Sequence, residues 1–161
     1  MLPTIKENFS RAFFAFLFSM ITIGILSFLS FETPYGLFLA GSFGSSMVLL
    51  FGYPESPFAQ PKNVFFGHLV TSLVGVLVLQ FVPVDQFLQI AIAVSLGIFV
   101  MILLSITHPP AGGNPIIVIL GMASYEYLLN PIILGSVIMI ACAIIINRFI
   151  LKKNYPTNWV N

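Results

Sequence analysis

Long apolar runs separated by short polar breaks dominate the pattern of this chain. Four of these runs have roughly the 20 residues that a helix needs to cross a bilayer, and they cover residues 12–31, 62–82, 86–106 and 131–150. Two further apolar segments, 34–52 and 115–124, are interrupted or short. The pattern predicts an all-α fold, a polytopic transmembrane helix bundle of about six segments, two of them broken or half helices.

Prolines mark where several of the segments begin. Thr33-Pro34, Asn114-Pro115 and Asn130-Pro131 each place a capping residue before a proline that suits the first helical turn. The segment 115–124 would reach about 15 Å, half the hydrocarbon thickness. It crosses only if the extended stretch 108–114 completes it. The alternative is that 34–52 and 107–124 are re-entrant and that only the four long helices cross.

Two short stretches hint at an internal repeat. Residues 44–52 and 113–121 both run from a glycine, through two helix-starting residues and five apolar residues, to a second glycine eight positions on. A proline that opens a long helix follows each stretch. The halves 1–82 and 83–150 would then each hold a long helix, a broken element and a long helix. Three crossings per half would make the two repeats inverted.

Composition agrees with a membrane protein and excludes several other classes. The 161 residues are 58% hydrophobic and 7% charged, with a mean hydropathy of +1.05. A net charge of +1 gives no basic field for nucleic acid. The single cysteine, Cys142, forms no intrachain disulfide, and we expect neither a metal nor another cofactor. The first run is long for a signal peptide and lacks a clean cleavage site, so we expect a retained helix.

The charged residues sort to one side if all six segments cross. Every lysine and arginine then lies on one face, and the opposite face holds only acids, which predicts cytoplasmic termini and a cytoplasmic tail at 151–161. The first face holds Lys6, Arg11, Lys62, Arg148, Lys152 and Lys153 with Glu7 and Glu55, and the second holds Glu32, Asp85 and Glu126. Because no plastid transit peptide is visible, we expect a bacterial inner membrane location. A bundle this small makes a homo-oligomer plausible.

The polar breaks are the candidate working site. Irregular backbone at membrane depth survives only inside protein or beside a wet cavity. Half-helices starting near Ser45 and Pro115 would point their N-termini at the midplane, where free N–H groups attract a small anion. The predicted substrate-binding residues are Ser42, Gly44, Ser45, Ser46, His108, Gly112, Gly113 and Asn114. Close helix packing by the small residues and a plain turn at 108–110 are the alternatives.

A proline-rich loop and a second histidine complete the candidate set. The loop after the second segment is either a rigid connector or a gate at the mouth of the site. Gating or proton-linked roles are predicted for Glu55, Gln60, Lys62, Asn63 and His68. His68 could instead bond to a neighbouring helix. Both histidines titrate near neutral pH when unperturbed, so we also expect anion affinity to depend on protonation.

The motifs resemble those of a known family. The His-Pro-Pro triplet with its Ala-Gly-Gly-Asn-Pro extension at 108–115, the element at 41–46 and the loop at 54–64 with Gly67-His68 are similar to the HPP family of small membrane proteins. Plant-plastid and cyanobacterial members are associated with nitrite transport, which the resemblance implies here. The family is usually described with fewer than six spans. A structural or sensory subunit and an intramembrane enzyme using His108 remain competing hypotheses, the enzyme disfavoured because no second acid, nucleophile or metal ligand accompanies either histidine.

Overall fold

A computed structural model describes residues 5–157; the remaining parts of the predicted 1–161 domain, 1–4 and 158–161, lie outside the described residues. Every regular element in this part of the chain is helical, which confirms the all-α prediction. The main helices are α1 (Ile5–Phe31), α2 (Gly41–Met47), α3 (Pro61–Phe81), α4 (Gln86–Leu103), α5 (Asn114–Leu120) and α6 (Leu134–Ile144). Short helical turns extend some of them: η1 (Val48–Gly52), η2 (Pro57–Ala59), η3 (Pro109–Gly113), η4 (Leu128–Ile133) and η5 (Ile145–Ile150).

Four helices are long and apolar enough to cross a membrane. They cover Asn8–Phe31, Pro61–Phe81, Gln86–Leu103 and Leu128–Ile150. The last is irregular at Asn130, whose backbone is not helical, and helical backbone continues from Pro131 into α6, in agreement with the predicted start. The other two segments, α2 with η1 and η3 with α5, are shorter. The predicted bundle of four long and two partial helices is therefore confirmed.

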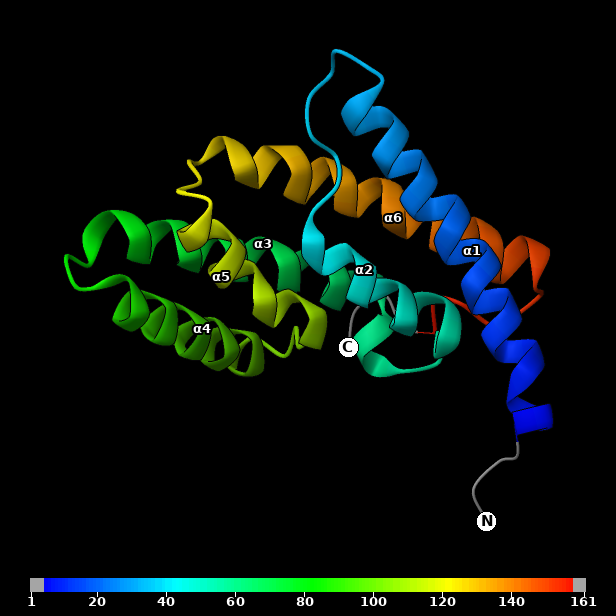
Figure 1. Ribbon diagram of the computed structural model, residues 1–161. Coiled ribbons are helices and arrows are strands. Elements are labelled where there is room, and N and C mark those ends of the chain that lie inside the picture. Colours follow the sequence, from blue (N-terminus) through cyan, green and yellow to red (C-terminus); the bar gives the residue numbers. More distant parts are fainter. Residues whose placement is uncertain (1–4, 158–161) are drawn as a thin grey trace.

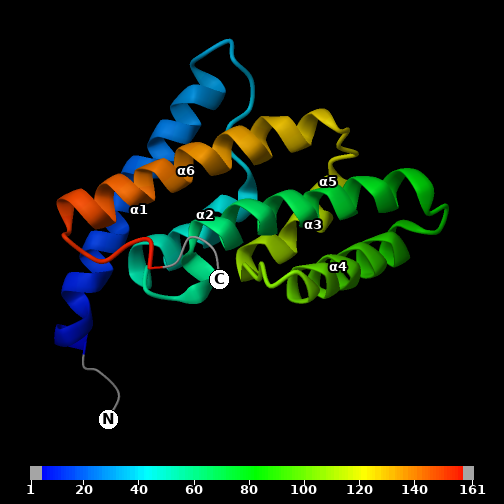
Figure 2. The ribbon, with the colours of Figure 1, turned by 180° about the vertical axis from the view of Figure 1, so that it is seen from behind.

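The short helices α2 and α5 lie inside the bundle and run in opposite directions (Figures 1 and 2). From α2 to α6, successive helices alternate in direction, whereas α1 and α3 run in broadly the same sense (Figure 1). The chain must therefore return between α1 and α3, and residues 32–52 provide that return. This arrangement favours six crossings over four. It also fits two inverted halves, although the repeat itself stays a prediction.

The second segment begins later than the sequence predicts. Residues 36–40 are not helical and α2 starts at Gly41, so the predicted helix start at Thr33-Pro34 is wrong. The Thr33 hydroxyl donates instead to the Leu29 carbonyl at the end of α1. The N–H groups of Phe38 and Leu39 donate to Ser30 Oγ at 2.9 and 3.1 Å. These bonds satisfy backbone that would otherwise be costly at membrane depth.

The break before α5 is also different from the prediction. The stretch predicted to be extended contains η3, a turn of 3₁₀ helix that leads directly into α5. The preceding helix α4 ends at Leu103, three residues early, and Ser105 adopts a left-handed φ of 54°. Only residues 104–108 are non-helical. Residues 109–120 thus form one short helical element.

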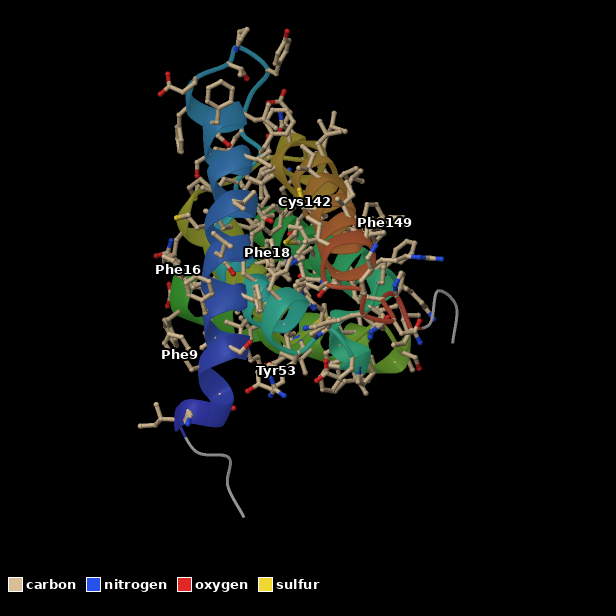
Figure 3. All side chains as sticks on the ribbon, turned by 90° about the vertical axis from the view of Figure 1, so that its right-hand side faces the viewer. Phe9, Phe16, Phe18, Tyr53, Cys142 and Phe149 are labelled. Carbon is tan, nitrogen blue, oxygen red and sulfur yellow. The ribbon has the colours of Figure 1, made fainter. Side chains whose placement is uncertain are left out.

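Helix α3 is the centre of the bundle. It packs against α4, α5 and α6, and Gly75 brings it so close to α5 that an added Cβ would lie 3.0 Å from the Cα of Pro115. Helix α1 is more peripheral and crosses α2 and α6 (Figure 1). Figure 3 shows its Phe9 and Phe16 on the outer side and Phe18 toward the bundle. The outer face is suited to lipid.

Cysteine accessibility provides a test of the six-crossing topology. We expect Glu32→Cys, Asp85→Cys and Glu126→Cys, in a Cys142→Ala background, to react with a membrane-impermeant maleimide added outside intact cells. All three side chains are exposed in the structure, and the positive-inside rule places them opposite the lysines and arginines. Labelling of position 85 from the cytoplasmic side alone would contradict six crossings and favour four.

Candidate functional site

Six polar side chains from three separate parts of the chain meet inside the apolar bundle. We call them the polar cluster: Ser42 and Ser46 on α2, His68 and Thr71 on α3, His108 before η3, and Asn114 at the start of α5. Ser42 is 7% exposed and the other five are fully buried. The two imidazole rings lie edge to face with centroids 4.9 Å apart. Four of the predicted binding residues thus converge, together with His68, at the breaks in the two short segments.

Ser46 connects the two histidines. Its Oγ lies 2.9 Å from His68 Nε2 and 2.8 Å from His108 Nε2. On the far side of its ring, His108 Nδ1 bonds to the carbonyl oxygen of Phe58 at 2.7 Å. Both rings therefore have hydrogen-bond partners on each nitrogen, which is what a buried histidine requires. The alternative of a plain turn at His108 does not account for its bond to α2.

Asn114 forms hydrogen bonds with His68 on the ring edge opposite Ser46. Its Nδ2 lies 3.1 Å from His68 Nδ1, 3.1 Å from the His68 carbonyl oxygen and 3.2 Å from Thr71 Oγ1. Its Oδ1 is buried and has no hydrogen-bond partner. The Asn114 amide thus spans the gap between α5 and α3. An unpaired buried acceptor is unusual in a folded protein and calls for an explanation.

The backbone N–H groups are placed differently from the sequence prediction. The first turn of α2 is at Gly41, so Ser45 and Ser46 lie in the second turn, where helix N–H groups bond within the helix. The element 109–120 opens with Pro109 and Pro110, which carry no N–H, and the Ala111 N–H bonds to the His108 carbonyl at 2.9 Å. The donors that face the centre of the site are therefore mostly side chains.

The remaining predicted binding residues lie outside the polar cluster. Gly44 and Ser45 are exposed, and Gly44 lines a groove of about 780 Å³ between α1 and α2 that also contains Arg11. Gly112 and Gly113 are half-buried, and a methyl group added at either would meet no atom within 4 Å. These four positions border the site without contributing to its hydrogen bonds. Their roles as substrate contacts stay predictions.

The predicted gate loop is an ordered part of the structure. Gln60 Nε2 donates to the carbonyls of Pro54 and Ser56, and Asn63 Nδ2 donates to the Thr107 carbonyl at 2.9 Å. Asn63 thus joins α3 to the residue before His108. Glu55 is exposed and Lys62 is half-buried, each beside a surface pocket. Of the five residues in the gating set, only His68 belongs to the polar cluster.

The C-terminal tail packs onto the same loop, which the sequence did not indicate. Tyr155 is 1% exposed and its hydroxyl donates to the Ala59 carbonyl at 2.8 Å. The Thr157 N–H donates to Gln60 Oε1 at 2.9 Å. Burial raises the pKa of the Tyr155 phenol above its usual range, so the hydroxyl keeps its proton. Phe58, whose carbonyl receives the His108 bond, directly precedes these two anchored residues.

These features define a helical membrane protein with a polar site enclosed between two short internal helices. The chain belongs to the HPP family, because the family described as HPP, transmembrane region, matches residues 4–156. It is 35% identical over 128 residues to one transmembrane protein of Dictyostelium discoideum, covering 75% of this chain and 45% of the relative. A second transmembrane protein of that organism is 33% identical over 165 positions, covering 96% of this chain and 53% of the relative. The chain spans about half the length of these relatives, and no solved structure matches it.

Proposed function

We propose that this chain transports a small monovalent anion across a membrane, with nitrite as the preferred substrate and the polar cluster as its binding site. The observation that supports this most is the convergence of fully buried polar side chains at the breaks of two membrane-embedded segments. Polar and ionisable groups inside a membrane are costly and usually serve function. Broken helices near the midplane are a recurrent way for transporters to build a substrate site.

The chemistry of the cluster suits a small oxyanion. Two imidazoles, two serine hydroxyls and an amide can present N–H and O–H donors to its oxygens. A protonated histidine would add the charge that the cluster otherwise lacks. The first turn of α2 at Gly41 and Ser42 adds backbone donors at its N-terminal end. Nitrite itself is supported by the resemblance to plastid and cyanobacterial HPP proteins, and an inner (plasma) membrane location belongs to the same proposal.

The cluster is closed in this structure, since both histidines are 0% exposed. A transporter must open such a site to each side in turn, and hinging of α2 and of η3 with α5 would provide that movement. A structural or sensory subunit is the alternative. In that alternative, the glycines and serines would serve only close helix packing. Packing alone gives no reason to bury two histidines that both bond to one serine.

Flux into liposomes tests the proposal directly. Purified protein should admit nitrite faster than protein-free liposomes, with formate, nitrate and chloride as comparison ions. Liposomes without protein are essential because undissociated nitrous acid crosses lipid unaided. Equal rates with and without protein for all four ions would favour the structural alternative.

Gly113→Leu is expected to abolish flux while the protein still inserts and folds. An added Cβ at Gly113 would meet no atom within 4 Å, so we expect the closed state to accept a larger side chain there. The leucine would then obstruct the region beside Asn114 when a substrate must enter. Gly24→Leu on α1, which also has open space around it, is the matched control. Normal transport by Gly113→Leu would mean that this glycine does not face the pathway.

A further inference from the structure

The hydrogen bonds of the polar cluster fix where its protons lie. The Phe58 carbonyl can only accept, so His108 Nδ1 carries hydrogen and, in the neutral ring, Nε2 accepts. The Ser46 hydroxyl then donates to His108 Nε2 at 2.8 Å in preference to the Ser42 carbonyl oxygen, which is 3.3 Å away. Its oxygen is left to accept from His68 Nε2–H, and His68 Nδ1 accepts from the Asn114 amide. Asn114, His68, Ser46, His108 and the Phe58 carbonyl thus form one chain of bonds with a single direction.

We propose that His68, Ser46 and His108 form a proton relay, and that Asn114 pairs with His68 in both of its tautomers. This deepens the proposed function, on which it rests for the identity of the anion, by naming the proton as a second transported species. The relay needs no ordered water, because the two histidine nitrogens face the same hydroxyl at 2.9 and 2.8 Å. A hydroxyl that donates to one ring and accepts from the other can pass a proton between them.

A proton that arrives at His68 passes to His108 through the Ser46 hydroxyl. The proton binds Nδ1, and His68 becomes an imidazolium. His68 Nε2 then gives its hydrogen to Ser46 Oγ, while the Ser46 hydroxyl gives its own hydrogen to His108 Nε2. The products are a His108 imidazolium, an unchanged serine and a neutral His68 whose hydrogen is now on Nδ1. Loss of the His108 Nδ1 hydrogen to the opposite side completes the passage of one proton. Each ring then carries its remaining hydrogen on the other nitrogen, and rotation of the rings must restore the starting tautomers before the next proton.

The unpaired oxygen of Asn114 gains a role in this scheme. After the transfer, His68 Nδ1–H would point at the Asn114 Nδ2, which is also a donor. Rotation of the amide by half a turn would bring Oδ1, buried and unpartnered in this structure, to the place of Nδ2. The oxygen would then accept from His68 Nδ1–H, while the present amide bonds to the His68 carbonyl and to Thr71 Oγ1 would be lost. Asn114 can therefore pair with either tautomer of His68, and it favours the one with hydrogen on Nε2.

The surroundings of the two rings are neutral. Their partners across the packed elements are the Ser42 and Ser46 hydroxyls, the Asn114 amide, the Phe58 carbonyl and the edge-on ring of Phe43, whose centroid is 5.0 Å from that of His68. Each ring therefore has the other histidine as the titrating group in contact with it. Repulsion between two imidazolium ions favours one shared proton over two. A single excess proton is what a relay carries.

Nitrogen-15 NMR of histidine-labelled protein in liposomes tests the ground state without any transport assay. We expect hydrogen on Nδ1 of His108 and on Nε2 of His68 at neutral pH. The signals are assigned with His68→Gln and His108→Gln, each of which removes one ring. Hydrogen on Nε2 of His108 would overturn the relay, because Ser46 would then have no acceptor there.

Membrane-potential dependence of nitrite flux tests the transfer. One anion moving with one proton is electroneutral, so wild-type flux should not respond to a potassium–valinomycin potential. Ser46→Ala removes the hydroxyl but neither ring, and we expect it to lower the coupled proton flux roughly 100-fold. Any remaining nitrite flux should then follow the potential. Ser46→Thr restores a hydroxyl, and Ser124→Ala, in the loop before the last long helix, is the control for the substitution itself.

The outcomes separate the relay from the anion assignment. Nitrite flux in Ser46→Ala that stays coupled and insensitive to the potential would overturn the relay and leave the proposed transport intact. If no anion shows protein-dependent flux, the relay is tested by measuring proton flux driven by the membrane potential alone. A potential-driven proton flux that is lost in Ser46→Ala would support the relay and would rule out nitrite as the substrate. Its absence would overturn the relay.

Discussion

Replacing His108 with asparagine is expected to lower nitrite flux by roughly 10- to 100-fold, the usual loss for one hydrogen bond to a charged group. Asparagine keeps a polar side chain at the turn but cannot bear a positive charge. Flux into liposomes at saturating and limiting nitrite separates a loss of affinity from a loss of turnover. The fold should survive, because η3 and α5 start with their own prolines and the turn itself is unchanged.

The same variant should lose most of the pH dependence of binding. In the wild-type protein a protonated histidine attracts the anion, and raising the pH removes that proton. Anion affinity should therefore fall as the pH rises through neutrality, by at most about tenfold per pH unit for one co-bound proton. A wild-type affinity that is flat from about pH 5.5 to about 8 would make His108 a structural turn residue and the protein a passive channel.

Gly67→Ala, a substitution in α3, should displace His108 and reduce both stability and flux. An added Cβ at Gly67 would lie 2.8 Å from the Cβ of His108 and 3.3 Å from the Ile106 carbonyl oxygen. The segment before η3 must then move away from α3, which separates His108 from Ser46. We expect a loss of about 1–3 kcal/mol in stability, typical of overpacking, together with most of the flux.

Thermal unfolding in detergent and flux in liposomes measure the two effects of Gly67→Ala. Gly24→Ala is the matched control, since an added Cβ at Gly24 would meet no atom within 4 Å. Wild-type flux in Gly67→Ala would show that close contact between α3 and His108 is not required. Reduced flux with unchanged stability would still support the positioning role of Gly67.

The long helices were predictable because their signals are local. Apolar runs of sufficient length gave all four spans, and Pro61 and Asn114 mark helix starts within a residue of the observed ones. The start of α2 was missed because glycine and serine at 41–46 have the composition of a break. In the structure Ser42 and Ser46 are helical, and their hydroxyls bond to histidines 22 to 62 residues away. Tertiary contacts override weak helix propensity here.

The sequence indicates most residues of the candidate site, but it does not indicate how they are arranged in space. The two polar breaks drew attention to Ser46, His108 and Asn114, but His68 reads as one histidine on an apolar helix. Its central place depends on the packing of α2 and α5 against α3, which no local pattern encodes. The backbone anion site stays a prediction, and the prolines at the start of η3 leave fewer free N–H groups there than the sequence suggests.

The docked tail has a practical consequence for anyone who produces this protein. Tyr155 and Thr157 bind Ala59 and Gln60, the two residues that follow Phe58, whose carbonyl receives the His108 bond. We expect an affinity tag or fluorescent reporter fused directly after residue 157 to strain this loop and disturb the bond between Phe58 and His108. Such fusions should alter assays of activity more than assays of expression. An amino-terminal tag before α1, the peripheral helix of the bundle, is the safer choice.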